Sequence, residues 1–361
     1  MFKQKIRKIL IIRYDFVGDT ILTIPFIKNL KQNLSEAKID VLVSQISGQL
    51  LCGNPDVNKI FYFSRSSFHK YENVEAVSKK NEVYSSILGC AKALRKEKYD
   101  LIFVLKRSFS SAILAFLIGA KYRVGFSTQF RTFMLTQGVK YTRELHEVEN
   151  FLNCLRVIGI KPELYLPLIY PTKEETLRAN GFLVRLNGSK PKVLIHATSA
   201  HPYKMWPKRY FAALIDNLYK NYDAQFVFTG AKFDKSIYEE ILKQCVYRNK
   251  IKYINLCGFT NLRECYAIYQ GLDLAVCVDT GNSHLAACAG IPTYVLYGPT
   301  SSERWLPVGK NVVPVTLKQL LPCQPCEVKV KCSHLSCMKI LTPEFVFGKL
   351  QEVLENSLVR V

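Results

Sequence analysis

The sequence predicts an α/β protein made of two doubly wound domains, each with a parallel sheet covered by helices on both faces. Its 361 residues are enough for two domains of roughly 150 residues. Short β-branched runs alternate with stretches of helical periodicity, which is typical of parallel sheets. The alternation lapses once, in a segment rich in Pro, Gly, Asn and charge, and then resumes. We therefore expect domains at 1–170 and 192–361, joined by a linker at 171–191.

The elements of the first domain follow from periodicity. The run at Lys8–Arg13 predicts a strand, and the apolar spacing of Thr20–Leu34 predicts a helix after a turn at Gly18. Further strands are expected at Lys38–Ser44, Lys59–Phe63 and Tyr99–Leu105, and further helices at Tyr84–Lys96 and Ser110–Leu117.

The second domain repeats the pattern. Strands are expected at Val193–His196, Ala224–Thr229, Tyr253–Leu256, Leu272–Val278 and Thr293–Tyr297. Helices are expected at Tyr210–Tyr222, Ile237–Cys245, Leu262–Gln270 and Ser283–Ala289. A cysteine-rich segment at 323–337 and a final helix follow, and the sequence leaves open whether this helix packs back on the first domain. Because ligands of open α/β sheets bind beyond the carboxyl ends of the strands, we expect a cleft between the two sheets.

Composition excludes several protein classes. With 48% hydrophobic and 22% charged residues, the chain is an ordinary globular sequence rather than a disordered one. No apolar run is long enough for a membrane-spanning helix, and Arg13 and Asp15 interrupt the apolar start before it could serve as a signal peptide. Eight of the twelve cysteines are scattered, as expected for reduced, buried thiols. We expect a cytoplasmic protein.

The charge balance indicates polyanionic partners. Lys and Arg number 50 against 29 Asp and Glu, a net charge of +21. Nucleic acid, an acidic membrane and phosphorylated substrates are all compatible with this charge, but no nucleic-acid-binding module is present, and we expect no nucleic acid partner. A basic cluster falls in the first domain, formed by Lys106, Arg107, Lys121, Arg123, Arg131, Lys140 and Arg143. The alternative for any one of these residues is ordinary solvated charge.

The stretch VCVDTGNSHLAACAG (276–290) has the pattern of an anion-binding site. A strand ends at Asp279, Thr280 and Gly281 form a turn, and a helix begins near Ser283. The N–H groups and positive dipole at the start of that helix would bind an anion. The alternative is that Asp279 or Thr280 caps the helix and that His284 is merely packed.

Two further strand ends carry polar residues. In HATSAHPYKMWP (196–207), the hydroxyls of Thr198 and Ser199 are followed by Lys204, and hydroxyls with one ammonium suit a diphosphate. The alternative is a polar loop with a surface lysine. A third strand-end loop, Phe228-Thr229-Gly230, is followed by Asp234.

One carboxylate of the first domain is a candidate catalytic base. In RYDFVGDTILTIP (13–25), Asp19 lies on a Gly turn at the start of the first helix. Asp19 as an N-cap is the alternative, and Asp15 is the competing acid.

Together these segments resemble the lipopolysaccharide heptosyltransferases of glycosyltransferase family 9, over nearly the whole chain. The resemblance is carried by IIRYDFVGDTILTIP, KYDLIFVLKRSFSSA, RVGF, HEVENFLNCLRVIGI, HATSAHPYKMWPKRYF, FTGAKFD and VCVDTGNSHLAACAGIPTYVLYGPTSSERW. The resemblance implies the GT-B fold, with an N-terminal acceptor-binding domain and a C-terminal nucleotide-sugar-binding domain.

The resemblance also implies an activity. It implies inverting, metal-independent transfer of a heptose from ADP-L-glycero-D-manno-heptose to the inner core of lipopolysaccharide, with no cofactor required for catalysis. It assigns the general base to Asp19. It assigns donor binding to Thr198, Ser199, Lys204, Asp279, Thr280, Gly281 and His284, and a ribose contact to Asp234. The acceptor, a lipid-linked anionic saccharide, would meet Lys106, Arg107 and Arg123, and the enzyme would work as a peripheral protein on the anionic cytoplasmic face of the inner membrane.

Four cysteines are spaced closely enough to share one metal ion. Cys323, Cys326, Cys332 and Cys337 have C-x2-C-x5-C-x4-C spacing, which suits one structural zinc or iron ion but matches no standard zinc finger. Reduced packing or a disulfide is the alternative. Two other functions stay open: a related GT-B transferase with another nucleoside-diphosphate sugar, or with a different glycan or protein acceptor, and a non-catalytic, metal-bearing nucleic-acid binder.

Overall fold

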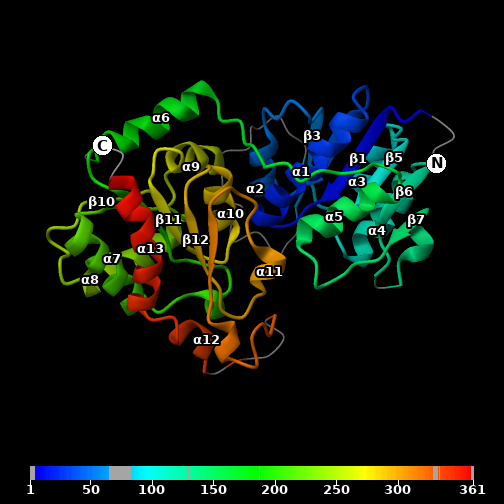
Figure 1. The fold of residues 1–361 in the computed structure, drawn as a ribbon. Helices are drawn as coiled ribbons and strands as arrows, with labels where there is room; N and C mark the ends of the chain where they lie inside the picture. The colour runs from blue at the N-terminus through cyan, green and yellow to red at the C-terminus, as the bar shows by residue number, and fades with distance from the viewer. Residues whose placement is uncertain are drawn as a thin grey trace. The chain divides into compact units, whose positions relative to one another are not determined.

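The chain divides after Tyr170 into two compact units. The computed structural model describes residues 5–64, 83–128, 130–186, 188–327, 332 and 334–358. Each unit contains one parallel sheet with helices on both faces (Figure 1). Helix α6 (Lys173–Leu183), within the expected linker, packs against α9 (Leu262–Tyr269) and belongs to the second unit.

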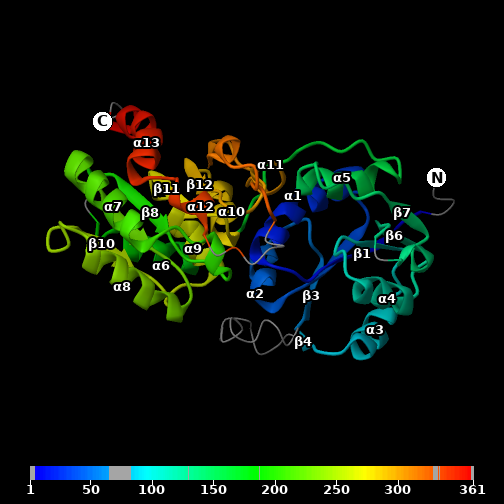
Figure 2. The same cartoon turned by 90° about the horizontal axis from the view of Figure 1, so that it is seen from below.

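The sheet of the first unit has the order β4-β3-β2-β1-β5-β6-β7. Its strands are β1 (Lys8–Arg13), β2 (Lys38–Val43), β3 (Lys59–Phe63), β4 (Val83–Tyr84), β5 (Leu101–Val104), β6 (Tyr122–Phe126) and β7 (Gln137–Val139). The helices are α1 (Val17–Asn33), α2 (Gln45–Gly48), α3 (Ile87–Arg95), α4 (Phe109–Ile118) and α5 (Glu147–Arg156), with short 3-10 turns η1 (Gln49–Leu51) and η3 (Thr132–Met134). In Figure 2, α1 and α5 cover one face of the sheet, and α3 and α4 cover the other.

The sheet of the second unit has the order β10-β9-β8-β11-β12-β13. Its strands are β8 (Lys192–His196), β9 (Gln225–Phe228), β10 (Tyr253–Asn255), β11 (Leu274–Val278), β12 (Thr293–Leu296) and β13 (Val312–Val315). Besides α6 and α9, its helices are α7 (Lys208–Tyr222), α8 (Lys235–Gln244), α10 (Gly281–Cys288), α11 (Ser302–Trp305), α12 (Ser336–Lys339) and α13 (Pro343–Leu358), with 3-10 turns η4 (Pro202–Lys204), η5 (Lys232–Asp234) and η6 (Lys318–Leu320).

Each unit has its own apolar core. In the first, Leu10 and Ile102 of the sheet pack with Leu94 and Leu114 of the covering helices. In the second, the sheet packs with α7, α8 and α13, and the buried Trp206 indole donates to the Leu341 carbonyl at 2.8 Å. The final helix α13 packs against α7, and its Leu350 and Leu354 join the core of the second unit.

Some expected elements were wrong in extent or were missed. Tyr84–Lys96 is not one helix: Val83–Tyr84 pairs with β3, and α3 starts only after Ser86, whose hydroxyl accepts from the Gly89 N–H at 3.1 Å. Strands β6, β7 and β13 were not expected. Gly125 weakens the strand signal of β6, and Pro314 that of β13, where a proline is tolerated at a sheet edge. Among the described residues, no helix is both long and apolar enough to cross a bilayer.

Candidate active site

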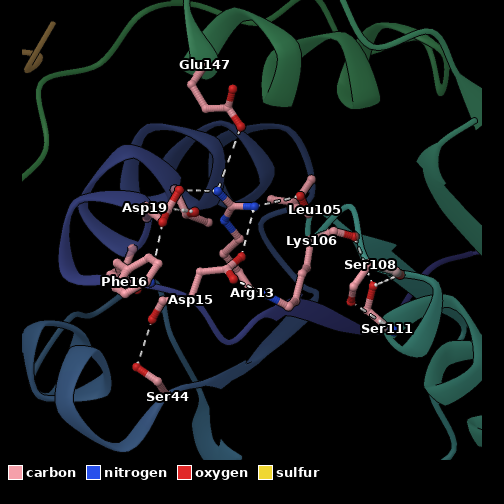
Figure 3. A network of polar contacts seen from close by, with 12 residues as sticks. Arg13, Asp15, Phe16, Asp19, Ser44, Leu105, Lys106, Ser108, Ser111 and Glu147 are labelled. Carbon is pink, nitrogen blue, oxygen red and sulfur yellow. Dashed lines mark hydrogen bonds and ion pairs between the residues drawn. The ribbon is translucent and has the colours of Figure 1, made fainter. Parts of the chain in front are cut away.

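The candidate site of the first unit lies at the carboxyl ends of β1 and β5. These neighbouring strands stand where the strand order changes direction, which is the usual ligand-binding position in an open α/β sheet. The chain leaving β1 supplies Asp15 and Asp19, and the chain leaving β5 supplies Lys106. Figure 3 shows these side chains gathered around Arg13, the last residue of β1.

Arg13 organises the carboxylates of this site. Its side chain is 4% exposed, and its guanidinium donates to the Leu105 carbonyl at 2.9 Å. Asp19 bonds to one guanidinium nitrogen, and an Asp15 oxygen lies 3.1 Å from another. A buried guanidinium is costly unless it is paired, and here several carboxylates raise its pKa despite the opposing effect of burial. Arg13 is therefore permanently charged and holds Asp15 and Asp19 in place.

Asp19 is a buried carboxylate in the first turn of α1. One oxygen faces Arg13, and the other accepts from the Phe16 N–H at 3.3 Å. Burial raises the pKa of Asp19, and Asp15 and Glu147 raise it further against the opposing effect of Arg13. A carboxylate with a raised pKa is a stronger base than an exposed one, so this environment suits general-base catalysis. The alternative of Asp19 as the N-cap is wrong, because Phe16 occupies that position and Asp19 is the third helical residue, whose carboxylate accepts from the N-cap N–H.

Asp15 is held differently. It pairs with Lys106, which is itself 7% exposed and lies 5.0 Å from the centre of the Tyr14 ring. The backbone carbonyl of Asp15 accepts from the Ser44 hydroxyl at 2.9 Å. Asp15 thus has an ammonium and a guanidinium as neighbours, whereas the partners of Asp19 are Arg13 and the Phe16 N–H.

Sequence reasoning missed Glu147, a fully buried carboxylate at the start of α5. Its Oε2 accepts from the Tyr141 hydroxyl at 2.6 Å, and its Oε1 lies 3.8 Å from Arg13 Nη2. The HEVEN motif contributed to the family resemblance without indicating a role for this residue. Only the tertiary fold brings Glu147, on α5, close to Arg13, so its role cannot be found from sequence spacing.

The basic residues expected to meet an acceptor are largely engaged within the unit. Lys106 is paired with Asp15, and the Arg123 guanidinium donates to the carbonyls of Ala120 and Met134 at 2.6 and 2.8 Å. Arg107 packs over the Tyr141 ring at 4.1 Å. Arg131 is fully buried and donates to the Lys106 carbonyl at 2.6 Å, so its role is to fix the loop after β5.

The candidate site of the second unit occupies the equivalent position, beyond β8 and β11. Asp279 follows β11 and is 5% exposed. Its Oδ2 accepts from Lys204 Nζ and from the Thr300 hydroxyl, each at 2.7 Å. Because Lys204 follows β8, this ion pair joins the two strand ends across the change in strand order. The lysine is thereby held beside the start of α10 rather than extended into solvent.

Helix α10 begins directly after this pair. Thr280 occupies the N-cap position, but its side chain makes no capping hydrogen bond, and among the residues that the structure describes its buried Oγ1 has no hydrogen-bond partner. Gly281 is the first helical residue, and His284 is buried one turn later. The first N–H groups of any helix lack intrahelical acceptors, so this end of α10 can bind an anion. Of the alternative, the N-cap position of Thr280 and the burial of His284 are as expected, but the threonine side chain forms no capping hydrogen bond.

A closed circuit of hydrogen bonds connects this helix to the sheet, and sequence reasoning missed it. His196 Nδ1 lies 3.1 Å from the Thr229 carbonyl, and His196 Nε2 lies 3.3 Å from the Asn282 amide nitrogen. Asn282 Oδ1 accepts from the Tyr269 hydroxyl at 2.9 Å, and that hydroxyl lies 2.5 Å from the Thr229 hydroxyl. Burial lowers the pKa of His196 to about 4, so the ring is neutral, donates through Nδ1 and accepts through Nε2. The circuit fixes Asn282 in the first turn of α10.

The remaining predicted donor residues lie at the ends of β8 and β9. Thr198 is buried near Asp234 and Tyr238, while Ser199 accepts from the His201 N–H at 3.2 Å. Asp234 accepts from the Ala231 N–H at 2.8 Å, and burial raises the pKa of its carboxyl. A Cβ at Gly230 would come within 2.5 Å of the Asp234 carboxylate, so a glycine is required there.

The four cysteines of the 323–337 segment line one small cavity. The cavity measures about 30 Å³, and its walls include Tyr203, His334, Cys323, Cys326, Cys332 and Cys337. Burial raises the pKa of Cys337, and the three other cysteines contribute to the shift. Within the residues described, no three His, Cys, Asp or Glu side chains form a ready-made metal cluster. The four cysteines nonetheless line the same cavity, and thiolates are the donor set that zinc and iron accept.

Comparison with known proteins identifies the family. Residues 87–335 match the family model for glycosyltransferase family 9 (heptosyltransferase). The lipooligosaccharide heptosyltransferase 2 of Campylobacter jejuni is 28% identical over 95% of this chain and 97% of its own length.

Solved structures share the fold. A family 9 glycosyltransferase from Veillonella parvula superposes with a TM-score of 0.83 at 20% identity, covering 98% of this chain and 99% of that one. The E. coli ADP-heptose lipopolysaccharide heptosyltransferase II gives 0.76 at 23% identity, covering 97% and 99%. The iron-containing dodecameric glycosyltransferase TibC of enterotoxigenic E. coli gives 0.58 at 15% identity, covering 99% and 78%. The two units thus have the GT-B fold, and the chain is a glycosyltransferase belonging to family 9, the heptosyltransferase family.

Proposed function

We propose that this enzyme transfers a heptose from ADP-L-glycero-D-manno-heptose to a sugar of the lipopolysaccharide inner core, with inversion at the anomeric carbon. The proposal rests on one observation, which is that each sheet has a polar site at its switch point. The site of the first unit contains the Asp19 carboxylate, and the site of the second unit contains Lys204 and the start of α10. The names of the relatives and structural neighbours, which include lipopolysaccharide and ADP-heptose enzymes, support the choice of donor and acceptor.

Asp19 is the general base of the proposed reaction. Its carboxylate takes the proton of the acceptor hydroxyl while that oxygen attacks the anomeric carbon from the face opposite the ADP leaving group. The C–O bond to the diphosphate breaks as the new glycosidic bond forms, and ADP leaves with the bonding electron pair. Arg13 holds Asp19 in position, and the raised pKa of Asp19 strengthens it as a base.

The second unit stabilises the leaving group. Lys204 and the N–H groups at the start of α10 offset the charge that grows on the diphosphate, as fixed dipoles and charges do in a preorganised site. Thr280 and Gly281 form the turn, and Asp279 and His284 border the donor. Thr198 and Ser199 contribute hydroxyls near the phosphates, and Asp234 contacts the ribose. No step in this scheme requires a metal ion.

The acceptor is proposed to be a lipid-linked anionic saccharide bound by the first unit. Of the three basic residues expected to contact it, Arg107 remains the best placed, because the polar groups of Lys106 and Arg123 bond within the unit. The surplus of positive charge supports work as a peripheral protein at the anionic cytoplasmic face of the inner membrane, without nucleic acid as a partner.

We also propose a structural zinc or iron ion held by the four cysteine thiolates. Four thiolates leave no open position for substrate or water, so the ion would stabilise the 323–337 segment and take no part in transfer. Elemental analysis of purified protein tests for the metal. Chelation should lower the melting temperature and leave the activity of the remaining folded protein intact. Loss of turnover without loss of folded protein, restored by one divalent ion, would contradict a structural role.

A donor panel tests the proposed reaction. ADP-heptose should give turnover with an inner-core acceptor that lacks the heptose to be added, and the product should have the anomeric configuration opposite to that of the donor by NMR. UDP- and GDP-sugars should give none. Turnover with another nucleoside-diphosphate sugar, or with a protein acceptor alone, would instead favour a related transferase.

A further inference from the structure

We propose that the face of the first unit formed by α3, α4 and η3 docks on an anionic lipid bilayer and inserts aromatic side chains into it. This inference deepens the proposed function by naming the surface through which a lipid-linked acceptor is reached. We call the face the aromatic surface and define it by six exposed or half-exposed apolar residues: Leu88, Phe109, Ile113, Phe116, Phe130 and Phe133.

Helix α4 has an unusual composition for a helix at the surface. Its ten residues include no charged side chain. One face packs against the sheet, and the outward positions Phe109, Ile113 and Phe116 follow helical spacing. An outward stripe of this kind normally consists of polar residues, since a helix that is apolar all round is normally buried or in contact with lipid. Exposure to water alone does not explain this apolar stripe on α4.

The loop after β6 extends this stripe. Arg131 points inward and bonds to the carbonyls of Lys106 and Ser108 and weakly to the Ser111 hydroxyl, which fixes the loop against the start of α4. Its neighbours point outward, with Phe130 96% and Phe133 73% exposed. Turn η3, which contains Phe133, also packs on α4. At the other end of α4, the Arg123 guanidinium lies 5.6 Å from the Phe116 ring centre.

Basic residues lie beside the aromatic surface, on α3 and just beyond the end of α4. Helix α3 packs beside α4, and the groove between them, of about 430 Å³, is lined by Leu88, Ala91, Lys92, Arg95, Lys96 and Leu117. Lys92, Arg95 and Lys96 are exposed, as is Lys121 just beyond α4. Residues 101–143 contain seven Lys and Arg but no Asp or Glu.

Charge complementarity therefore selects the partner. Exposed aromatic residues surrounded by cations match an anionic bilayer, in which the rings lie among the acyl chains and the ammonium groups face the lipid phosphates. A protein partner or a second copy of this chain would need acidic groups opposite the cations. Residues 101–143 provide no acidic group for such self-association.

Vesicle binding tests the proposal without donor or acceptor, so its outcome is independent of sugar transfer. The full-length protein should sediment with vesicles of phosphatidylglycerol and phosphatidylcholine and should bind pure phosphatidylcholine far more weakly. Phe130→Ser/Phe133→Ser should lower the partition coefficient at least tenfold. Lys92→Ala/Lys96→Ala/Lys121→Ala should lower it by about fivefold per charge at low salt.

Matched variants provide the controls. Val184→Ser/Val246→Ser removes two equally exposed apolar residues from the second unit, and Lys220→Ala/Lys243→Ala/Lys250→Ala removes three exposed charges there. Both should bind vesicles as the unmodified protein does. Phe133→Trp should be quenched by brominated acyl chains, whereas Val184→Trp should not. Circular dichroism and melting temperature verify that each variant is folded.

The outcomes are decisive. Equal binding by the aromatic variant and its control, or no quenching of the tryptophan at 133, would overturn the proposal. So would a change from dimer to monomer in Phe130→Ser/Phe133→Ser with vesicle binding unaltered, since the surface would then be a contact between copies. Transfer to a delipidated, soluble acceptor should be unchanged in the same variant.

Discussion

Replacement of Asp19 by Asn is the sharpest test of the proposed mechanism. The amide keeps the shape of the side chain and removes the base. Loss of a positioned general base lowers turnover by about 10² to 10⁴, which corresponds to roughly 3 to 5 kcal/mol of barrier. Because Asp19 belongs to the first unit and the donor cradle to the second, ADP affinity should stay within about twofold of the unmodified enzyme.

The structure also predicts a pH signature. Burial raises the pKa of Asp19 above its ordinary value, with Asp15 and Glu147 adding to the shift. Only the deprotonated form acts as a base, so kcat/KM should fall as the pH decreases through this raised pKa. The acid limb should vanish in Asp19→Asn and persist at a lower pH in Glu147→Gln, because one of the carboxylates that raise the pKa has lost its charge.

Asp15→Asn is the matched control. This carboxyl is already paired with Lys106 and lies 3.1 Å from Arg13, so its loss should cost less turnover than loss of Asp19. Steady-state kinetics with a soluble acceptor measures both variants, and calorimetry with ADP measures donor binding. If Asp19→Asn keeps activity within a fewfold while Asp15→Asn loses more, Asp15 is the base and the present assignment is wrong.

Three other predictions concern the second unit and the pairing of Arg13. Lys204→Ala should weaken ADP binding about tenfold to a hundredfold, because one charge-assisted phosphate contact contributes about 1.5 to 3 kcal/mol; unchanged affinity by calorimetry would remove Lys204 from the diphosphate site. The pKa of His196 in the folded protein is about 4, against an ordinary value of 6.5, so the unfolded chain binds the proton more readily. The free energy of unfolding should therefore fall by about 3 kcal/mol as the pH decreases from 6.5 to 4. That dependence should be absent in His196→Gln, and an identical pH profile for the two proteins in denaturant titrations would contradict it. Glu147→Gln should lower the melting temperature, since Arg13 loses one of its buried carboxylate neighbours, and an unchanged melting temperature would show that Asp15 and Asp19 suffice.

Periodicity predicted most of the fold because most elements have a strong local signal. The strand at Lys59–Phe63 is confirmed at both ends, and the helix expected at Thr20–Leu34 is confirmed with shifted bounds, since it starts at Val17 and ends at Asn33. Elements whose identity depends on their neighbours were missed. β13 contains a proline and is a strand only because β12 offers it an edge, and β4 is two residues long. The features that make β4 and β13 strands lie in the neighbouring strands and not in their own residues.

The same distinction applies to the site. Asp19, Lys204 and Asp279 were predicted because they follow strand ends. A strand followed by a turn and a helix can be recognised from a single sequence. Arg13 was missed because it ends an apolar strand, and because two of its partners, the Leu105 carbonyl and Glu147, come from other segments. The circuit through His196 and Asn282 was missed for the same reason, since its members lie up to 86 residues apart. Only the tertiary fold brings such residues together.

Thr280 gives a final prediction in which stability and function change in opposite directions. Within the described part of the chain its buried hydroxyl has no hydrogen-bond partner and does not cap α10, so we expect it to cost the free protein about 1 to 3 kcal/mol. Thr280→Val keeps the shape and removes the cost, and it should raise the melting temperature. If the hydroxyl turns toward the diphosphate when donor binds, the same variant should lose about twofold to tenfold in ADP affinity, whereas Thr280→Ser should retain it. A lower melting temperature in Thr280→Val would mean that the hydroxyl is satisfied in the free protein. A higher melting temperature with unchanged ADP affinity would remove the hydroxyl from the donor site while leaving Lys204 and the start of α10 as its anion-binding groups.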